Sequence, residues 1–211
     1  FLDAGDGDQV FSFADLGVEK QDYQWFEVTK EGNKALSPAI SGNDITFSFT
    51  NADCGEKEVH LLIEDRIEYV FTMVVITKVI KTADELSELT TYGTVTDVET
   101  NIEKQETWHP TQNAWKQKGY FILGNNIDMT GREIANYHTT YAAYGDYGLN
   151  GGFDGRGYTI LGGTYAQGGL FGSIPEGSVI KNVAILNVHF SGVWSSVIGS
   201  CIFGTVENVL I

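Results

Sequence analysis

The segment from Gly168 to Phe190 places its apolar residues at an unusual spacing. The steps between them are three, two, three and two, at Ile180, Val183, Ile185, Val188 and Phe190. A flat strand buries every second side chain, and a helix buries side chains at steps of three and four. The pattern therefore predicts an interior face of short strands, with one extra residue at Asn182 and another at Asn187, where the chain bends.

A corner–apolar–any–apolar pattern recurs through the second half of the chain. Its corner residues, at spacings of 31, 25 and 26 residues, are Asn126, Gly157, Asn182 and Asn208. A second turn residue follows five positions after the first three of these corners, at Gly131, Gly162 and Asn187. Asn and Gly adopt a left-handed backbone at low cost, and stacked Asn side chains can bond the next Asn or backbone. A period near 25 residues with strand spacing indicates a β-solenoid, in which each turn of the coil is a rung and successive rungs stack in parallel.

Residues 1–80 show a different pattern, in which short alternating runs are separated by clusters of Gly, Asn and Asp. The runs are QVFSF, YQWFEV, ITFSF, EVHLLIED and YVFTMVVITKV, and the separators are EGNK, SGND, NADCGEK and EDRIE. Half-buried strands joined by such turns are typical of an antiparallel β-sandwich. Trp25 is interpreted as an aromatic residue of its core.

Residues 81–118 are predicted to connect the two halves. Thr82 is a suitable N-cap, Glu85 is its reciprocal partner, and Leu86 and Leu89 share a face, so a short helix is expected. The polar stretch after it is predicted to be an irregular cap. Its aromatic residues, which form either an exposed binding site or the packing of the loop, are Trp108, His109 and Trp115.

The interval between Asn126 and Gly157 is about six residues longer than the next interval and contains an insertion rich in tyrosine. Insertions in solenoids map to loops on one side, often the binding side. Tyrosine offers a flat apolar face and a hydroxyl group for contact with sugar or peptide. The candidate binding residues, whose alternative role is to cover the first rung, are Tyr137, Tyr141, Tyr144 and Tyr147.

Composition narrows the classes of function. The chain has 13 Lys and Arg against 28 Asp and Glu, a net charge of −15, so nucleic-acid binding is not expected. No apolar run is long enough to span a membrane. Cys54 and Cys201 fall in different predicted domains, so no disulfide is expected. No metal site or cofactor is predicted, because the histidines lack the spacing of metal ligands: His60, His109, His138 and His189.

The sequence offers candidate catalytic residues but does not show that they lie close together. A glycosidase needs two carboxylates at a defined separation, and Asp128, Asp146 and Asp154 are available but not placed side by side by the sequence. A lyase needs a base, and the visible basic residues of the rungs are Arg156 and Lys181. Catalysis within these residues is the less favoured interpretation.

Two resemblances extend this interpretation. The order YQWFEVTKEG…ITFSFTNADCGEKEVHLLIED…YVFTMVVI resembles the later strands of bacterial immunoglobulin-like domains, without their first strand. The pattern GYFILGNNIDMTG…GGFDGRGYTILG…GGLFGSI…GSVIKNVAILNV is similar to the opening rungs of right-handed parallel β-helices in bacterial surface proteins, which include GLUG-type and pectate-lyase-like solenoids. TADELSEL resembles the helix that leads into them.

These resemblances imply an all-β protein with three regions. Residues 1–80 are expected to form an immunoglobulin-like sandwich, 81–118 a helix and cap, and 119–211 the truncated start of a β-helix. The implied function is a non-catalytic extracellular surface or adhesion module of a bacterium, which presents the β-helix to glycan or to a surface protein. The alternatives are a truncated polysaccharide lyase or glycoside hydrolase and a purely architectural fragment. Further rungs or a partner chain are expected to cover the C-terminal end.

Overall fold

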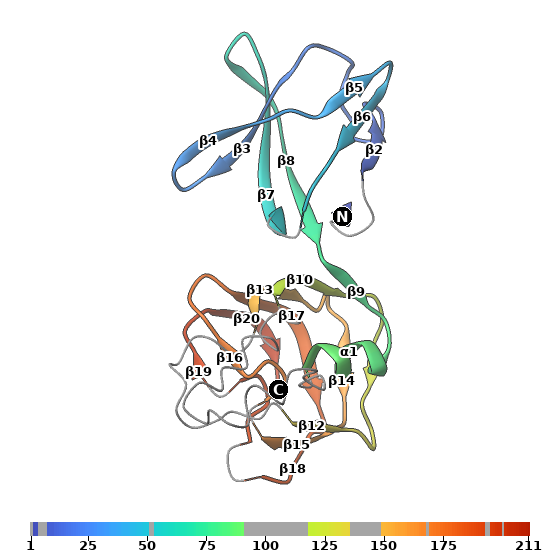
Figure 1. The fold of residues 1–211 in the computed structure, drawn as a ribbon, viewed down its shortest axis with the longest axis vertical. Helices are drawn as coiled ribbons and strands as arrows, with labels where there is room; N and C mark the ends of the chain where they lie inside the picture. Colours follow the sequence, from blue (N-terminus) through green and yellow to red (C-terminus); the bar gives the residue numbers. More distant parts are fainter. Residues whose placement is uncertain are drawn as a thin grey trace, which may run out of the picture. The chain divides into compact units, whose positions relative to one another are not determined.

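The chain divides into two compact units in the computed structural model, Phe1–Lys78 and Val79–Ile211 (Figure 1). The residues that the structure describes are 2–3, 8–50, 53–90, 118–135, 149–167, 169–192, 195–199 and 201–211. In these ranges the regular structure is almost entirely β-strand, with one short helix, so the prediction of an all-β protein is confirmed.

The first unit contains two sheets. The larger sheet has the order β1 (Leu2–Asp3), β8 (Arg66–Ile76), β7 (Gly55–Ile63), β3 (Gln24–Thr29) and β4 (Gly32–Leu36). The smaller has the order β2 (Gln9–Ser12), β6 (Asp44–Phe47) and β5 (Ala39–Ser41). Neighbouring strands are antiparallel except β1 and β8, which pair in parallel.

Alternation along these strands places one face of each sheet in a shared core. Trp25 is 4% exposed and meets the rings of Phe47 and Phe71 edge-on, so its predicted core position is confirmed. The hairpin between β7 and β8 turns at Glu64 and Asp65, whose φ angles of 49° and 62° suit a tight two-residue turn. The core of this unit includes Phe13, Val18, Tyr23, Trp25, Ile45, Phe47, Val59, Leu61, Met73 and Val75.

Three strands of the first unit were not predicted, because their sequences lack the alternation of a half-buried strand. β4 and β5 are almost wholly exposed, so nothing in their sequence distinguishes an inner from an outer face. β1, in the region where no strand was expected, is two residues long and pairs Leu2 with Val75.

The second unit is a stack of parallel strands, called here the parallel stack. Its strands are β10 (Lys118–Leu123), β11 (Ile127–Asp128), β12 (Glu133–Ala135), β13 (Asn150–Asp154), β14 (Thr159–Leu161), β15 (Thr164–Gln167), β16 (Ser173–Ile174), β17 (Val179–Leu186), β18 (His189–Phe190), β19 (Cys201–Ile202) and β20 (Thr205–Leu210). The short strand β9 (Lys78–Ile80) pairs with β10. The ladders are β10–β13–β17–β20, β11–β14–β17, β12–β15–β18 and β16–β19, and every pair in them is parallel.

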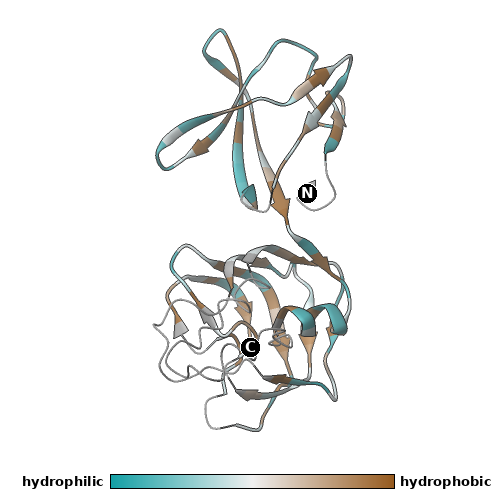
Figure 2. Cartoon of the chain, in the orientation of Figure 1, coloured by the Kyte–Doolittle hydropathy of each residue, from teal (hydrophilic) through white to brown (hydrophobic). Residues whose placement is uncertain are grey.

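Apolar residues from successive repeats form columns inside the parallel stack. The register places Phe121, Phe153, Ile180 and Val206 beside one another. Figure 2 shows hydrophobic positions recurring on neighbouring strands of this unit. Ile180, Val183 and Ile185 are buried as predicted, whereas Phe190, at the end of its ladder, is 47% exposed. One continuous core therefore holds the repeats together.

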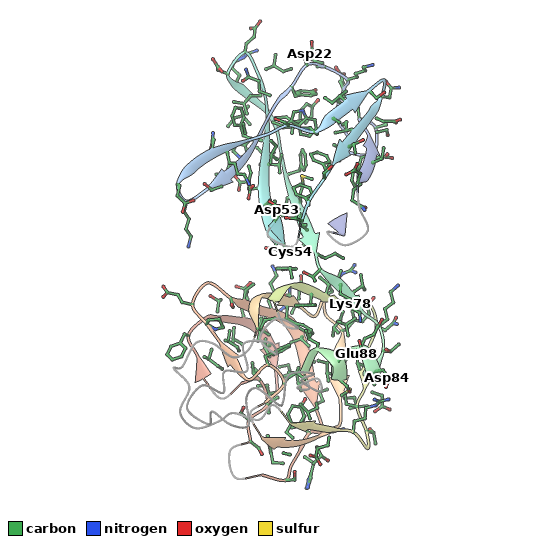
Figure 3. All side chains as sticks on the ribbon, viewed as in Figure 1. Asp22, Asp53, Cys54, Lys78, Asp84 and Glu88 are labelled. Atoms are coloured by element: carbon green, nitrogen blue, oxygen red, sulfur yellow. The ribbon has the colours of Figure 1, made fainter. Side chains whose placement is uncertain are left out.

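The helix α1 (Ala83–Thr90) packs Leu86 and Leu89 into the core of the parallel stack. Its predicted capping box is confirmed: the backbone N–H of Glu85 donates to Thr82 Oγ1 at 3.2 Å, and the backbone N–H of Thr82 donates to Glu85 Oε2 at 3.0 Å. Asp84, labelled in Figure 3, pairs with Arg132 beside β12 at 2.6 Å. The helix thus covers the stack at its first repeat.

The corner residues of the repeat have mostly left-handed backbones. The φ angles are 54° at Asn182, 56° at Asn187 and 50° at Asn208, and they lie between 76° and 81° at Gly131, Gly157 and Gly162. Asn126 has no such φ, and its Oδ1 instead accepts the backbone N–H of Thr159 at 2.9 Å.

The first corner also differs from the predicted alignment. The register pairs Ile127 with Ile160, which places Asn126 beside Thr159 rather than beside Gly157. The reason is an extra turn after β13, at Gly155–Tyr158, closed by a hydrogen bond from the Tyr158 N–H to the Gly155 carbonyl. Residues in a turn add chain length without adding a rung, and sequence spacing alone does not reveal them.

Candidate functional site

The binding residues predicted from the sequence lie outside the described residues. This holds for both tryptophans of the connecting region and for all four tyrosines of the insertion, namely Trp108, Trp115, Tyr137, Tyr141, Tyr144 and Tyr147. The site described below rests on other residues.

A shallow hollow of about 280 Å³ lies along the second corner of the parallel stack. It follows the column of Gly131, Gly162 and Asn187, which the sequence identified as turn positions of successive repeats. Its lining residues are Thr130, Gly131, Leu161, Gly162, Gly163, Thr164, Asn187 and His189.

Two adjacent glycines shape this hollow. Gly162 and Gly163 have φ angles of 77° and 94°, which L side chains rarely adopt. A Cβ atom at Gly162 would lie 2.7 Å from Thr130 Oγ1, so only glycine permits the two repeats to approach this closely. The hydrogen bond from the Gly162 N–H to the Leu186 carbonyl, at 2.8 Å, ties the same corner to the next repeat. The backbone of Gly162, at the floor of the hollow, is therefore held between Thr130 of the preceding repeat and Leu186 of the next.

The walls of the hollow combine polar side chains with one apolar residue. Thr164 and His189 are neighbours in the β15–β18 ladder and lie on the outer face, because the next residue, Tyr165, is buried. Asn187 and His189 are exposed, and Leu161 is 37% exposed. The outer position predicted for His189 is confirmed. Hydroxyl, amide and imidazole groups around an apolar surface provide donors and acceptors for a polar ligand with an apolar face.

Asp128 adds a carboxylate next to the hollow. The register places it beside Leu161, and its Oδ1 accepts the backbone N–H of Thr130 at 2.9 Å. The hydrogen bonds from Thr130 lower the pKa of Asp128 below its ordinary value of 3.8. The carboxylate is therefore ionised at neutral pH, and it orients the Thr130 backbone at the rim.

Asp154, another candidate carboxylate, serves the corner of the stack. Its Oδ1 accepts the backbone N–H of Arg156 at 2.8 Å and the Asn182 side-chain amide at 3.1 Å. Asp146, the third carboxylate considered, lies outside the described residues. Asp128 and Asp154 thus have local hydrogen-bonding roles, and the structure does not pair these two carboxylates across a shared cleft.

Several polar side chains of the first unit have partners within that unit. Lys57 and Glu27 form an ion pair of 2.8 Å, although each is largely buried. Asp53 accepts the backbone N–H of Thr50 at 3.0 Å, and the thiol of Cys54 lies 3.1 Å from the Thr77 hydroxyl; Figure 3 labels Asp53 and Cys54. Cys54 does not form a disulfide within the described residues. In the part of the chain that the structure describes, no group of three or more metal-ligating side chains occurs.

Within the described ranges, no helix is both long enough and apolar enough to cross a bilayer.

Most of the hollow was not predicted as a site. Gly131, Gly162 and Asn187 were identified as corners only, and Thr130, Leu161 and Thr164 were not singled out. The available signal was the pair Gly162–Gly163, because consecutive glycines after a strand suggest a close backbone approach. Tyr137, the first tyrosine of the predicted binding loop, comes six positions after Gly131, so the predicted loop and the hollow are neighbours in the sequence.

Comparisons with protein-family models, with curated proteins and with solved structures found no match to this chain. The hollow is therefore interpreted from its own geometry and chemistry.

Proposed function

We propose that this chain is a non-catalytic binding module of an extracellular bacterial surface protein. It consists of an immunoglobulin-like domain followed by a right-handed parallel β-helix, and the β-helix binds glycan at the corner hollow. The immunoglobulin-like domain serves as a spacer.

The strand orders support both parts of this architecture. The first unit has sheets of β2–β6–β5 and β1–β8–β7–β3–β4, which match the division of an immunoglobulin fold into strands B, E, D and strands A′, G, F, C, C′. The second unit has parallel ladders between repeats 26 residues apart at β17 and β20, which a coiled solenoid requires.

The observation that carries the functional part is the composition of the hollow. Sugars present hydroxyl groups around a ring that also has apolar C–H faces. Leu161 offers an apolar contact, and Thr130, Thr164, Asn187 and His189 surround it with donors and acceptors. The hollow is open and shallow, which suits a residue within a longer glycan chain.

A glycan array tests this proposal with the whole chain and two matched pairs of variants. Asn187→Gly removes the amide but keeps the left-handed backbone, and Asn208→Gly makes the same change at a corner outside the hollow. Thr164→Val removes a hydroxyl from the hollow, and Thr205→Val removes one from an exposed position on β20. We expect the two hollow variants to bind a positive glycan at least about fivefold more weakly, since each loses about one hydrogen bond.

The two control variants are expected to bind like the wild type. Equal binding by all four variants would remove the hollow from the binding site, and the absence of any positive glycan would contradict the glycan assignment. Thermal unfolding of each variant separates a loss of binding from a loss of folding.

A further inference from the structure

The first repeat of the parallel stack places one carboxylate on each side of the corner at which the hollow lies. These are Asp128 on β11 and Glu133 on β12, and the turn between them contains Thr130 and Gly131 of the hollow's lining. Each carboxylate residue is exposed, whereas the residue that follows it in the chain is buried. Alternation along a strand therefore directs both carboxylates to the outer face of the stack.

The register sets each carboxylate beside a residue that lines the hollow. Asp128 pairs with Leu161 in the β11–β14 ladder, and Glu133 pairs with Thr164 in the β12–β15 ladder. Paired residues on neighbouring strands lie about 5 Å apart. A ligand that contacts Leu161 and Thr164 is therefore next to a carboxylate at each of these two positions.

Basic side chains do not offset this negative charge within the hollow. Among the described residues that line it, none is Lys or Arg. Arg132, which lies between the two carboxylates in the sequence, pairs instead with Asp84 of α1 at 2.6 Å. His189 also lines the hollow, but Thr164 separates it from Glu133 in the β12–β15–β18 ladder. The rim formed by the first repeat is therefore negative and suits a cationic group of a ligand.

We propose that the hollow selects a glycan with unacetylated amino sugars, whose ammonium groups bind Asp128 and Glu133. This inference rests on the proposed function, because it names the class of sugar that the glycan-binding hollow accepts. An ammonium group brings a positive charge and three N–H donors to the carboxylates. The N-acetylated form of the same sugar presents a neutral amide there, so the carboxylates discriminate between the two forms.

Two oligosaccharides of equal length test this selectivity, the β-1,4-linked tetramers of glucosamine and of N-acetylglucosamine. Isothermal titration calorimetry measures the binding of each to the whole chain at a slightly acidic pH, at which the amine is protonated. We expect the glucosamine tetramer to bind at least about fivefold more tightly. This preference is expected to shrink in high salt, since salt screens exposed charges.

Two charge-removing variants test whether these carboxylates cause the preference. Asp128→Asn and Glu133→Gln keep the shape of each side chain, and the first still offers an oxygen to the Thr130 N–H. We expect each variant to lower the preference about threefold and the double variant to abolish it. Glu176→Gln is the matched control, because it removes the same charge at an exposed turn between β16 and β17 that does not line the hollow. It is expected to keep the preference.

Several results would overturn the selectivity without touching the glycan site. Equal binding of the two tetramers is one, and if Asn187→Gly and Thr164→Val still weakened both, the hollow would remain a glycan site. An equal loss of preference in Glu176→Gln would show that the charge of the whole chain attracts the amine. Loss of binding on addition of EDTA would show that a metal ion bridges the sugar to the carboxylates. The absence of any positive glycan would contradict the proposed function as well.

Discussion

The side-chain amide of Asn208 donates a hydrogen bond of 2.7 Å to the Oδ1 atom of Asn182, which lies one repeat earlier. Both residues have left-handed backbones, with φ angles of 50° and 54°. The same side chain therefore turns the chain and joins two repeats. Asn182 passes the contact on to Asp154, so a polar ladder runs along the corner while apolar columns fill the interior.

The corner at Asn182 allows its two roles to be measured separately. Asn182→Gly keeps the left-handed backbone and loses the amide contacts, so we expect a loss of about 1–2 kcal/mol in the free energy of unfolding. Asn182→Ala loses the same contacts and also strains the backbone, which costs about 1 kcal/mol more. Urea unfolding followed by circular dichroism measures both. Equal stability of the two variants would show that the left-handed backbone has no energetic importance here.

Gly155 is expected to be intolerant of any side chain. A Cβ atom there would lie 2.5 Å from the Asn182 carbonyl oxygen and 2.4 Å from the Val183 Cβ atom, so Gly155→Ala forces two repeats apart. We expect a loss of about 3 kcal/mol or failure to fold. Gly177→Ala is the matched control, because that site is open and costs only the strain of its φ of 83°, about 1 kcal/mol. Similar melting temperatures for the two variants would contradict the close packing of repeats.

The capping box of α1 predicts a small and specific effect. Thr82→Ala removes the oxygen that accepts the Glu85 N–H, and we expect it to lower the free energy of unfolding by about 1 kcal/mol. Thr82→Ser retains the oxygen and should recover most of that loss. Chemical denaturation of the wild type and of both variants measures these free energies of unfolding. If Ser were as destabilising as Ala, the methyl group of Thr82 rather than its hydroxyl would stabilise the helix start.

Tyr165 is predicted to oppose stability through its hydroxyl group. The residue is fully buried, and its hydroxyl has no hydrogen-bond partner among the described residues, so Tyr165→Phe should raise the free energy of unfolding by about 1–3 kcal/mol. Tyr158→Phe, at a half-buried position, is the control and should change stability little. A destabilised Tyr165→Phe variant would indicate that the hydroxyl makes a stabilising contact.

The same residue predicts a pH dependence. Burial raises the pKa of Tyr165 above its ordinary value of 10.0, because the charged form is poorly solvated. The unfolded chain loses this proton near pH 10 and the folded chain does not, so the wild type should lose stability as the pH rises above 10. The Tyr165→Phe variant should show a shallower decline. Unfolding midpoints between pH 8 and pH 11 would measure the difference, and parallel curves would contradict it.

Local patterns were sufficient for much of the architecture. The step of three and two residues around Asn182 and Asn187 predicted both bends, because the side-chain period of a strand is set by the backbone itself. The capping box was also predictable, because its two residues, Thr82 and Glu85, are only three positions apart in the sequence. The exposed strands β4 and β5 were missed, since burial creates the alternation on which the prediction depends.

The candidate site was much less predictable. Thr130, Thr164 and His189 are not close in sequence, and they line one hollow only because successive repeats stack in register. The alignment at Asn126 failed for a related reason, as a turn after β13 adds residues without moving the next strand.

The order of amino acids on its own predicts most of the bends, most of the inward-pointing side chains and most of the corners, because these properties depend on neighbours a few positions away; Phe190 and Asn126 are the exceptions. Stacking decides the rest. It pairs Asn208 with Asn182 and assembles the hollow from separate repeats. These features depend on register between distant segments, which packing of the whole core selects and no short stretch of sequence contains.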